Sequence, residues 1–389
     1  MGYVEMIKIL YVSGSRADYG PARNVLKLLN SDVRFELSVL VTGMHLDVVH
    51  GETWREIVED GLTIAESVTG HIEGDSVTEM AASLGAYLHG MSYAISRIRP
   101  DVLLVLGDRG EQLAGSIAGA FHNIVVVHLC GGSISGSIDD SIRHAITKFA
   151  HYHLPAFEEH ANRILQMGES PDRVKIVGLP GNDISSDVTF SREEVCFQFH
   201  LPLDKPYILV LQHAVSHTFN IADSQIVETL DALSVLDDSV LLANPNDDAG
   251  GRVILSRMKE YASKYDHMQI LPPVASRELF ASIMCHSSVL VGNSSAGIVE
   301  AMNLGLPVVN IGDRQSGREY QSCMINVDYK SEDIYKAIQL ALHDETYQQK
   351  LLDFTKCVKY IDTPTEVVNF IANIDLDVGQ YQKPFVDFN

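Results

Sequence analysis

The sequence predicts an α/β protein in which two doubly wound domains face each other. The prediction rests on short apolar runs that alternate with longer helical patterns, and on a series of such runs that starts twice. Runs that are apolar at consecutive positions suit strands buried on both faces of a helix-covered parallel sheet. The first series comprises Ile7–Ser13, Glu36–Thr42, Val102–Gly107, Ile124–Leu129 and Val174–Gly178, and the second comprises Tyr207–Gln212, Val240–Asn244, Ser288–Gly292 and Pro307–Gly312.

The boundary between the two predicted domains falls in a turn-rich stretch. A chain of 389 residues is long enough for two domains of roughly 150 to 200 residues each. Strands that alternate with helical segments form βαβ units, which the two series supply separately. Between the series lie Gly178–Gly181 and Leu201–Pro206, whose Gly and Pro residues disfavour regular structure. We therefore expect an N-terminal domain over residues 1–180 and a C-terminal domain over residues 181–363.

The composition narrows the class of protein. With 46% hydrophobic and 21% charged residues the chain has the composition of a folded globular protein, and it contains no apolar run of the ~18 residues that a membrane span needs. A net charge of −22 disfavours binding to nucleic acid, because most of the surface repels phosphate. The cysteines are odd in number, form no CxxC pair and indicate a reducing, cytoplasmic location; they are Cys130, Cys196, Cys285, Cys323 and Cys357.

Polar residues follow the first predicted strands, at the edge of a parallel sheet where ligands gather. After the first strand, Arg16 suits a phosphate or sugar contact, whereas Asp18 either joins that contact or caps the following helix. After the third strand, Asp108 and Arg109 form either a simple ion pair or a base whose charge is tuned by its neighbour.

The next predicted strand runs into Cys130 and then into a helix start. Asp139 suits a helix N-cap region as well as a site residue. Arg143 and His144 are adjacent, so they cannot share a helix face and at most one of them points into the cleft.

Two strand ends in the second half carry further candidates. His213 follows the first strand there, and is either a packed side chain or a group that takes part in the chemistry. Asn246 follows the next strand, in a polar turn that suits a plain loop or a nucleotide contact equally well. Both residues therefore remain candidates.

The loop Gly292–Ser295 gives the clearest signal for a ligand. Free N–H groups and the hydroxyls of Ser294 and Ser295 converge at a predicted helix start, which suits a diphosphate. Glu300 cannot serve a phosphate but suits a ribose diol, and Arg314 is the nearer of two cations after the following strand. The chain lacks the GxGxxG and GxxxxGK[ST] patterns and any His, Asp or Glu cluster at metal-ligand spacing. These residues predict a nucleotide-diphosphate ligand between two lobes, and acid–base chemistry without a metal.

The motifs occur in the order found in a known family. They resemble those of the hydrolysing UDP-N-acetylglucosamine 2-epimerases, most strongly the sialic-acid-pathway branch, from about residue 7 to about residue 370. The resemblance implies the glycosyltransferase-B fold, an active site between two Rossmann-like domains, and residues 364–389 crossing back to the first domain. It also implies a homodimer and no external cofactor. The matching motifs are Arg16–Tyr19, Gly107–Arg109, Gly131–Gly132, Gly136–Lys148, Leu211–His213, Gly292–Ser295 and Asp313–Gln315.

The resemblance also implies a reaction and residue roles. UDP leaves from C1 of UDP-N-acetylglucosamine as C2 loses its proton, and water then adds to the 2-acetamidoglucal with inverted C2 geometry to give N-acetylmannosamine, a precursor of sialic-type acids. Asp108, Asp139 and His213 match the acid–base positions of the family. The UDP-binding positions match Arg16, Asn246, Ser294, Ser295, Glu300 and Arg314, while Asp18, Arg109 and Arg143 are expected to contact substrate.

The chain departs from the family at two positions. Cys130 and Ser133 stand where the family commonly has Glu residues, before and after the Gly-Gly pair. The thiol is either an inert small side chain or a substitute acid or base. The departure leaves open a UDP-2,4-diacetamido-trideoxy sugar as substrate, as in the legionaminic acid pathway. It also leaves open a glycosyltransferase or a non-catalytic UDP-sugar-binding protein.

Overall fold

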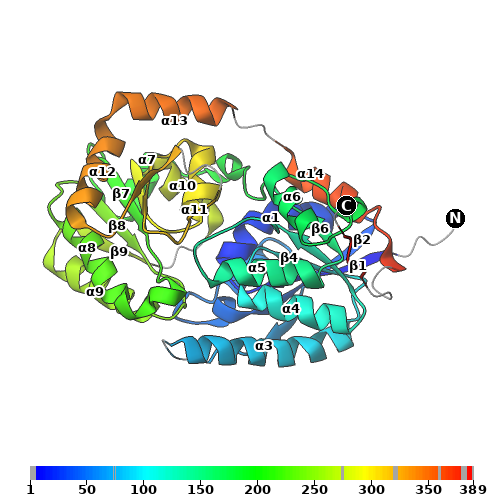
Figure 1. The fold of residues 1–389 in the computed structure, drawn as a ribbon. Coiled ribbons are helices and arrows are strands. Elements are labelled where there is room, and N and C mark those ends of the chain that lie inside the picture. Colours follow the sequence, from blue (N-terminus) through cyan, green and yellow to red (C-terminus); the bar gives the residue numbers. More distant parts are fainter. Residues whose placement is uncertain are drawn as a thin grey trace.

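Two parallel sheets organise the chain, one built from its first half and the other from its second (Figure 1). The computed structural model describes residues 6–72, 74, 76–272, 276–318, 323–357, 361–377 and 383–387. Within them each sheet has six strands, in the orders β3-β2-β1-β4-β5-β6 and β12-β11-β10-β7-β8-β9. Counted from the start of each domain, both orders are 3-2-1-4-5-6, the Rossmann arrangement. The predicted fold of two doubly wound domains is confirmed.

The first sheet is buried on both faces because its strands are apolar at consecutive positions. In β1, Ile9 and Tyr11 enter one core, whereas Leu10 and Val12 enter the core on the opposite face. Helices cover both faces. The strands are β1 (Ile7–Ser13), β2 (Phe35–Thr42), β3 (Ile64–Val68), β4 (Val102–Leu106), β5 (Val125–Leu129) and β6 (Tyr152–Leu154), and the helices are α1 (Arg16–Ser31), α2 (Trp54–Glu59), α3 (Val77–Ile98), α4 (Gly110–Phe121), α5 (Ile138–Phe149) and α6 (Glu158–Gln166).

The second sheet is also buried on both faces, because Leu209 and Leu241 enter one core whereas Val210 and Leu242 enter the core on the opposite face. Its strands are β7 (Tyr207–Leu211), β8 (Ser239–Ala243), β9 (Met268–Leu271), β10 (Val289–Gly292), β11 (Val308–Ile311) and β12 (Ile325–Val327). The helices are α7 (Arg192–Gln198), α8 (Ala222–Ser234), α9 (Gly251–Lys264), α10 (Arg277–His286), α11 (Ala296–Val299), α12 (Ser331–His343) and α13 (Glu345–Cys357).

One predicted strand is wrong. Val174–Gly178 runs beside β6 but forms only an isolated bridge, between Val174 and His153. The amides of Lys175 and Val177 donate to the carbonyls of His153 and Pro155, at 3.0 and 3.1 Å. Pro155 has no N–H to return a bond, so the ladder cannot continue. The short strands β3, β6, β9 and β12 were not predicted, and each lies at or next to a sheet edge.

The chain returns to the first domain at its end. Helix α13 leads to α14 (Thr363–Ile371), which packs against α1 beside the first sheet (Figure 1). Val367 and Ile371 are buried in the core of that sheet. Further on, the Lys383 ammonium group donates to the carbonyls of Thr147 and Ala150 at 2.9 and 2.7 Å. Described residues after 363 therefore contact the first domain, and the domain bounds stay a prediction.

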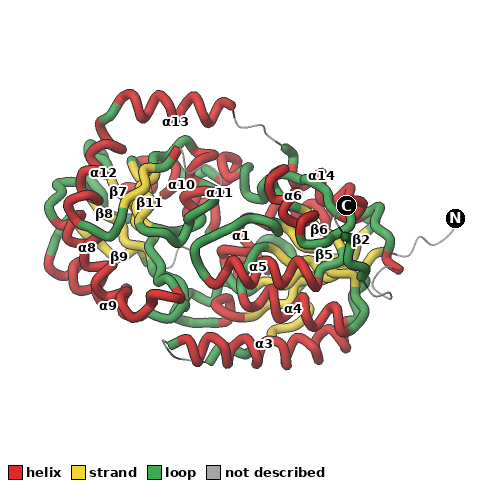
Figure 2. The backbone as a smooth tube through the Cα atoms, viewed as in Figure 1, coloured by secondary structure: helices red, strands yellow, loops and turns green. Residues whose placement is uncertain are grey.

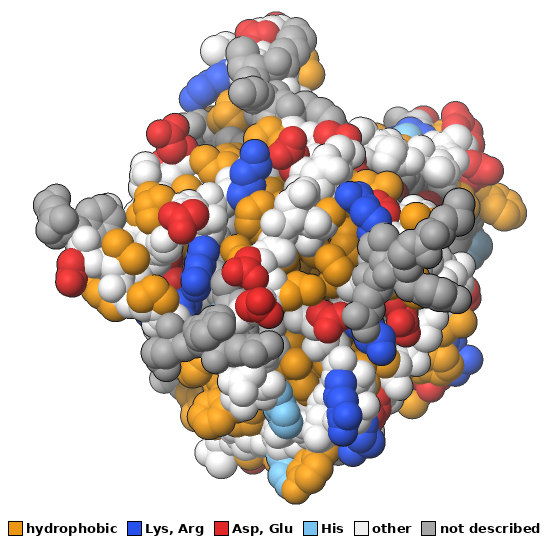
Figure 3. Space-filling view, turned by 90° about the vertical axis from the view of Figure 1, so that its right-hand side faces the viewer, with side chains coloured by type: hydrophobic (Ala, Val, Ile, Leu, Met, Phe, Trp, Pro, Cys, Tyr) orange, Lys and Arg blue, Asp and Glu red, His pale blue; other side chains and the backbone are white. Residues whose placement is uncertain are grey.

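The surface carries mixed charges. On the face shown in Figure 3, acidic and basic side chains are interspersed with scattered hydrophobic ones. Among the described residues, no helix combines the length and the apolar character that a bilayer crossing requires.

Candidate functional site

A cavity of about 390 Å³ lies between the two domains. Its walls come from loops that follow the carboxyl ends of strands in both sheets, and these loops meet in the middle of the molecule (Figure 2). The candidate residues named from the sequence border it with the exception of His144; they are Arg16, Asp18, Asp108, Arg109, Cys130, Asp139, Arg143, His213, Asn246, Ser294, Ser295, Glu300 and Arg314. Of the adjacent pair in α5, Arg143 borders the cavity and His144 does not. The structure thus brings the candidates together, while their roles stay predictions.

The turn after β1 holds Asp18 in a helix cap. Asp18 accepts hydrogen bonds from the Ser13 hydroxyl at 2.5 Å and from the amides of Gly14 and Ser15 at 3.0 and 2.8 Å. Burial raises the pKa of Asp18 to about 7, although these bonds oppose the rise. Both carboxylate oxygens therefore accept hydrogen bonds from the end of β1 and from the turn, which favours the capping alternative, and a substrate contact by Asp18 stays a prediction. Arg16 at the same turn pairs with Glu56 at 3.0 Å.

Asp108 follows β4 and is held by two arginines from different domains. Arg143 of α5, whose side chain is only 1% exposed, donates through Nη2 to Asp108 Oδ2. Arg318, which follows β11, donates to the same oxygen at 3.2 Å. Burial raises the pKa of Asp108, but the two guanidinium groups outweigh burial and hold it well below its ordinary value. Asp108 is therefore an ionised carboxylate.

Asp139 lies in the first turn of α5, two residues after the N-cap Ser137, and its pKa is shifted in the direction opposite to that of Asp108. Its Oδ2 accepts from Arg314 of the second domain at 3.2 Å. Burial and the nearby Asp108 carboxylate raise the pKa of Asp139, and Arg314 opposes them only in part. Two carboxyl groups with opposite pKa shifts in one cavity are an arrangement that suits acid–base chemistry, and the role of each stays a prediction.

His213 is neutral and has a defined tautomer. Its Nδ1 accepts from the amide of Asn246 at 3.1 Å, and its own amide donates to Asn293 Oδ1 at 2.8 Å. Burial, with Arg314 nearby, lowers the pKa of His213 to about 3. A neutral imidazole whose Nδ1 accepts carries its proton on Nε2. His213 can therefore donate a hydrogen bond to a ligand but does not bring a positive charge.

The side chain of Cys130 is a protonated thiol near neutral pH. Cys130 directly follows β5 and has a left-handed backbone conformation, at a φ of +62°. Burial and the Asp108 carboxylate raise the pKa of its thiol to about 12. A thiol in this state is neither a nucleophile nor a base near neutral pH. The geometry favours the inert alternative.

We therefore expect Cys130→Ser to keep turnover within about threefold of the unmodified chain, because a hydroxyl of similar volume stays neutral as well. Cys130→Glu is expected to be tolerated and to raise turnover of UDP-N-acetylglucosamine. Steady-state assays of both variants test this. A loss of tenfold or more in Cys130→Ser would show that the thiol takes part in the reaction.

The loop after β10 holds the hydroxyls of Ser294 and Ser295. Gly292 is required there, at a φ of +140°, because a Cβ atom would lie 2.1 Å from the carbonyl oxygen of Leu211. Helix α11 is only four residues long, and Glu300 directly follows its last residue. A ligand at this loop would therefore depend on local N–H groups and hydroxyls more than on a helix dipole. Glu300 is 7% exposed and lies 3.6 Å from Arg277 Nη1.

Several residues that build the site were not predicted. Arg318 is the second of the two cations noted after β11, but no role was predicted for it. Asp248 lies in the same turn as Asn246 and pairs with Arg109 at 3.0 Å. Arg277 and Phe280 were missed because they follow β9, a four-residue edge strand with no clear apolar run. Glu56 lies in α2 and follows no predicted strand, so no pattern pointed to it.

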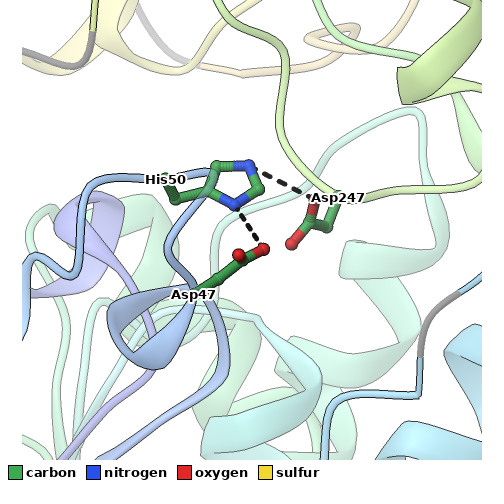
Figure 4. Close-up of side chains that lie close together, drawn as sticks. All are labelled: Asp47, His50 and Asp247. Atoms are coloured by element: carbon green, nitrogen blue, oxygen red, sulfur yellow. Dashed lines mark hydrogen bonds and ion pairs between the residues drawn. The ribbon is translucent and has the colours of Figure 1, made fainter.

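Three side chains, of which His50 borders the cavity, connect the domains (Figure 4). His50 lies between Asp47 and Asp247, with Nδ1 at 2.9 Å from the first carboxylate and Nε2 at 3.3 Å from the second. Their ligand atoms lie within 4.8 Å of one another, close enough to hold a metal ion. However, both imidazole nitrogens face the carboxylates, and Asp247 belongs to the second domain. We interpret the group as an interdomain bridge, and a metal-free reaction stays a prediction.

The chain is similar to known proteins over most of its length. A family model described as UDP-N-acetylglucosamine 2-epimerase matches residues 27–361. The UDP-N,N'-diacetylbacillosamine 2-epimerase (hydrolyzing) of Legionella pneumophila is 37% identical over 337 residues, which are 86% of this chain and 89% of that protein. The UDP-N-acetylglucosamine 2-epimerase of Neisseria meningitidis is 34% identical over 394 residues, with 99% of this chain and all of that protein covered.

Solved structures share the fold. The S. aureus MnaA–UDP structure has a TM-score of 0.78 and 17% identity, and covers 99% of this chain and 100% of that one. The Neisseria meningitidis UDP-GlcNAc 2-epimerase bound to UDP-GlcNAc has a TM-score of 0.75 and 15% identity, over 94% and 98% of the two chains. These likenesses establish the architecture, and the sequence matches above establish the relationship. The chain belongs to the UDP-N-acetylglucosamine 2-epimerase family, in its hydrolysing branch.

Proposed function

We propose that the protein is a hydrolysing 2-epimerase that converts a UDP-2-acetamido sugar and water into UDP and the C2-inverted free sugar. The observation that carries the proposal is the pair Asp108 and Asp139. One carboxyl group is held ionised and the other has a raised pKa, and arginines of the opposite domain contact both. Elimination followed by hydration needs such a base and acid on either side of one sugar ring.

The proposed steps use residues of both domains. As the C1–O bond to UDP breaks, a carboxylate takes the C2 proton, and the electron pair of the C2–H bond forms the C1–C2 double bond of a glucal. Water then adds its oxygen to C1 and releases a proton, while the acid gives its own proton to C2 on the face opposite to the one that lost the C2 proton. The proton released by water restores the acid, and the base returns the original C2 proton to solvent. We assign Asp108 to the base and Asp139 to the acid. Arg314, Ser294 and Ser295 hold the diphosphate, and the Nε2–H of His213 donates to the departing oxygen.

UDP-N-acetylglucosamine is the first substrate to test, because the Neisseria meningitidis relative of that name aligns with 99% of this chain. A UDP-2,4-diacetamido-trideoxy sugar is the second candidate. The Legionella pneumophila relative named for diacetylbacillosamine supports it, as do Cys130 and Ser133, where the family commonly has Glu.

Parallel incubations with both nucleotide sugars, followed by NMR of the released sugars, decide between them. The true substrate yields UDP and a C2-inverted sugar at the higher kcat/KM. Tight UDP binding with no turnover of either compound would instead support a non-catalytic binding protein. UDP release that depends on an added acceptor sugar would support a glycosyltransferase.

The pH dependence of turnover tests the assignment of Asp139. Because its pKa is raised, Asp139 keeps its proton at a higher pH than an ordinary carboxyl group, and it loses the acid form as pH rises through that pKa. We expect kcat/KM to fall on the alkaline side of the optimum for this reason. Asp139→Asn should lower kcat/KM by about 10²-fold and remove that alkaline decline. An unchanged decline in the variant would assign it to another group.

The assembly and location of the protein are proposals as well. The resemblance implies a homodimer, and light scattering would test this by measuring the molar mass of the protein in solution. The cysteine pattern supports a cytoplasmic location.

A further inference from the structure

Arg277 opens helix α10 in the second domain, and it is buried against the first. Its side chain is 7% exposed and borders the cavity. Gly20 of α1 leaves room for it, because a Cβ atom at that glycine would lie 2.6 Å from Arg277 Nη1. Gly181 is close on another side, with its Cβ position 3.6 Å from Nη2. The guanidinium group is therefore fixed in place between the two domains.

The partners of Arg277 leave one donor group unused. Its amide donates to Glu56 at 2.9 Å, Nε donates to Asp187 at 2.8 Å, and Nη1 lies 3.6 Å from Glu300. Nη2 is buried, and in the part of the chain that the structure describes it has no hydrogen-bond partner. A buried guanidinium nitrogen without an acceptor is costly, unless a ligand supplies that acceptor.

The surroundings of Arg277 suggest which part of a nucleotide supplies it. Phe280 lies three residues later on the same helix face and also borders the cavity, where its ring can cover a flat base. Glu300, beside Arg277, is a carboxylate that accepts hydrogen bonds and donates none when ionised. A ribose hydroxyl donates one hydrogen bond and accepts others, so it fits between a carboxylate and a guanidinium group.

We propose that Arg277 is a ribose-binding residue, which donates to a hydroxyl oxygen of the nucleotide while Glu300 accepts from the ribose. The inference rests on the proposed binding of UDP. It assigns to Arg277 a part in selecting ribonucleotides over deoxyribonucleotides, because a deoxyribose leaves the buried donor unpaired. Discrimination of this kind is large where a site is built to hydrogen-bond a hydroxyl.

Calorimetric titration with UDP, 2'-deoxy-UDP and 3'-deoxy-UDP tests the proposal. The unmodified protein should bind UDP at least about tenfold more tightly than one of the deoxy nucleotides. Arg277→Met should weaken UDP binding but barely change binding of that deoxy nucleotide, so that the ratio of their Kd values falls at least about fivefold. Arg277→Lys, which keeps a donor, should retain part of the ratio.

Arg23 offers a matched control in the same ion network. It pairs with Asp60 at 2.5 Å and lies 3.8 Å from Asp187, the partner of Arg277, but it does not border the cavity. Arg23→Met should therefore lower thermal stability and keep the UDP to deoxy-UDP ratio.

Two results would overturn the proposal. One is equal affinity of the unmodified protein for all three nucleotides, and this result does not depend on whether any variant folds. The other is an equal loss of affinity for all three nucleotides in Arg277→Met, which is the result expected if Arg277 has a purely structural role. Failure of the unmodified protein to bind UDP at all would instead refute the proposed function on which this inference rests.

Discussion

Asp108→Asn is expected to lower turnover by about 10³-fold while UDP still binds with nearly its original affinity. Asparagine preserves the shape of the side chain but cannot accept the C2 proton. It also leaves the buried guanidinium groups of Arg143 and Arg318 without their shared carboxylate. The proposed UDP contacts come mainly from the second domain, and they do not involve Asp108. Steady-state kinetics and UDP titration of the same protein sample measure both quantities.

Asp140→Asn is the matched control for this prediction. Asp140 pairs with the same Arg143, at 3.2 Å through Nη1, but its side chain is 32% exposed and does not border the cavity. Its removal weakens the ion pairing of Arg143 without removing the proposed base, so most of the turnover should remain. Equal losses in Asp108→Asn and Asp140→Asn would mean that Asp108 only supports Arg143. Loss of UDP binding alone in Asp108→Asn would also contradict the assignment.

Arg314→Met is expected to weaken UDP binding by about 100-fold, the size of effect that follows when one partner of a buried, hydrogen-bonded charge pair is removed. Arg314 contacts Asp139 at 3.2 Å and lies 3.9 Å from Asp248, and its Nη1 donates to the carbonyl of Asn293 at 3.3 Å. Without it, both carboxylates face the incoming diphosphate with less compensating charge. Calorimetry with UDP measures the loss.

Arg318→Met provides the contrast, because Arg318 follows the same strand but contacts Asp108 instead of Asp139. We expect it to lower turnover, with a much smaller effect on UDP affinity than Arg314→Met has. The two variants together separate nucleotide binding from the chemistry on the sugar. The assignment of the diphosphate to Arg314 fails if both variants lower the affinity for UDP equally, or if Arg314→Met does not lower that affinity.

The sequence was most informative where a strand is long and fully buried. The runs behind β1, β4, β7 and β10 were recognised, so the residues that follow them were recognised as well. The segment Val174–Gly178 was misread because its apolar residues resemble a strand, while Pro155 on the neighbouring segment prevents a ladder. Only the partner segment reveals this, so the run itself could not.

Other parts of the site could not be predicted for physical reasons. The contact of Arg318 with Asp108 joins positions 210 residues apart, and no local pattern encodes a pairing across two domains. Arg277 follows β9, whose four residues are half-buried in the middle, so the search at strand ends never reached it. Asp18 was named as a substrate contact or a cap, and only the geometry showed that one of its oxygens accepts from the N-cap amide of Ser15 and the other from the hydroxyl of Ser13.

The most direct test of the central claim is turnover of the UDP-2-acetamido sugar in heavy water, with NMR and mass analysis of the released sugar. The proposed elimination and hydration predict that UDP is released together with a C2-inverted sugar that carries one deuterium at C2. Release of an unlabelled sugar with its original C2 geometry would show simple hydrolysis at C1, and would contradict the assignment of Asp108 and Asp139 to proton transfer at C2.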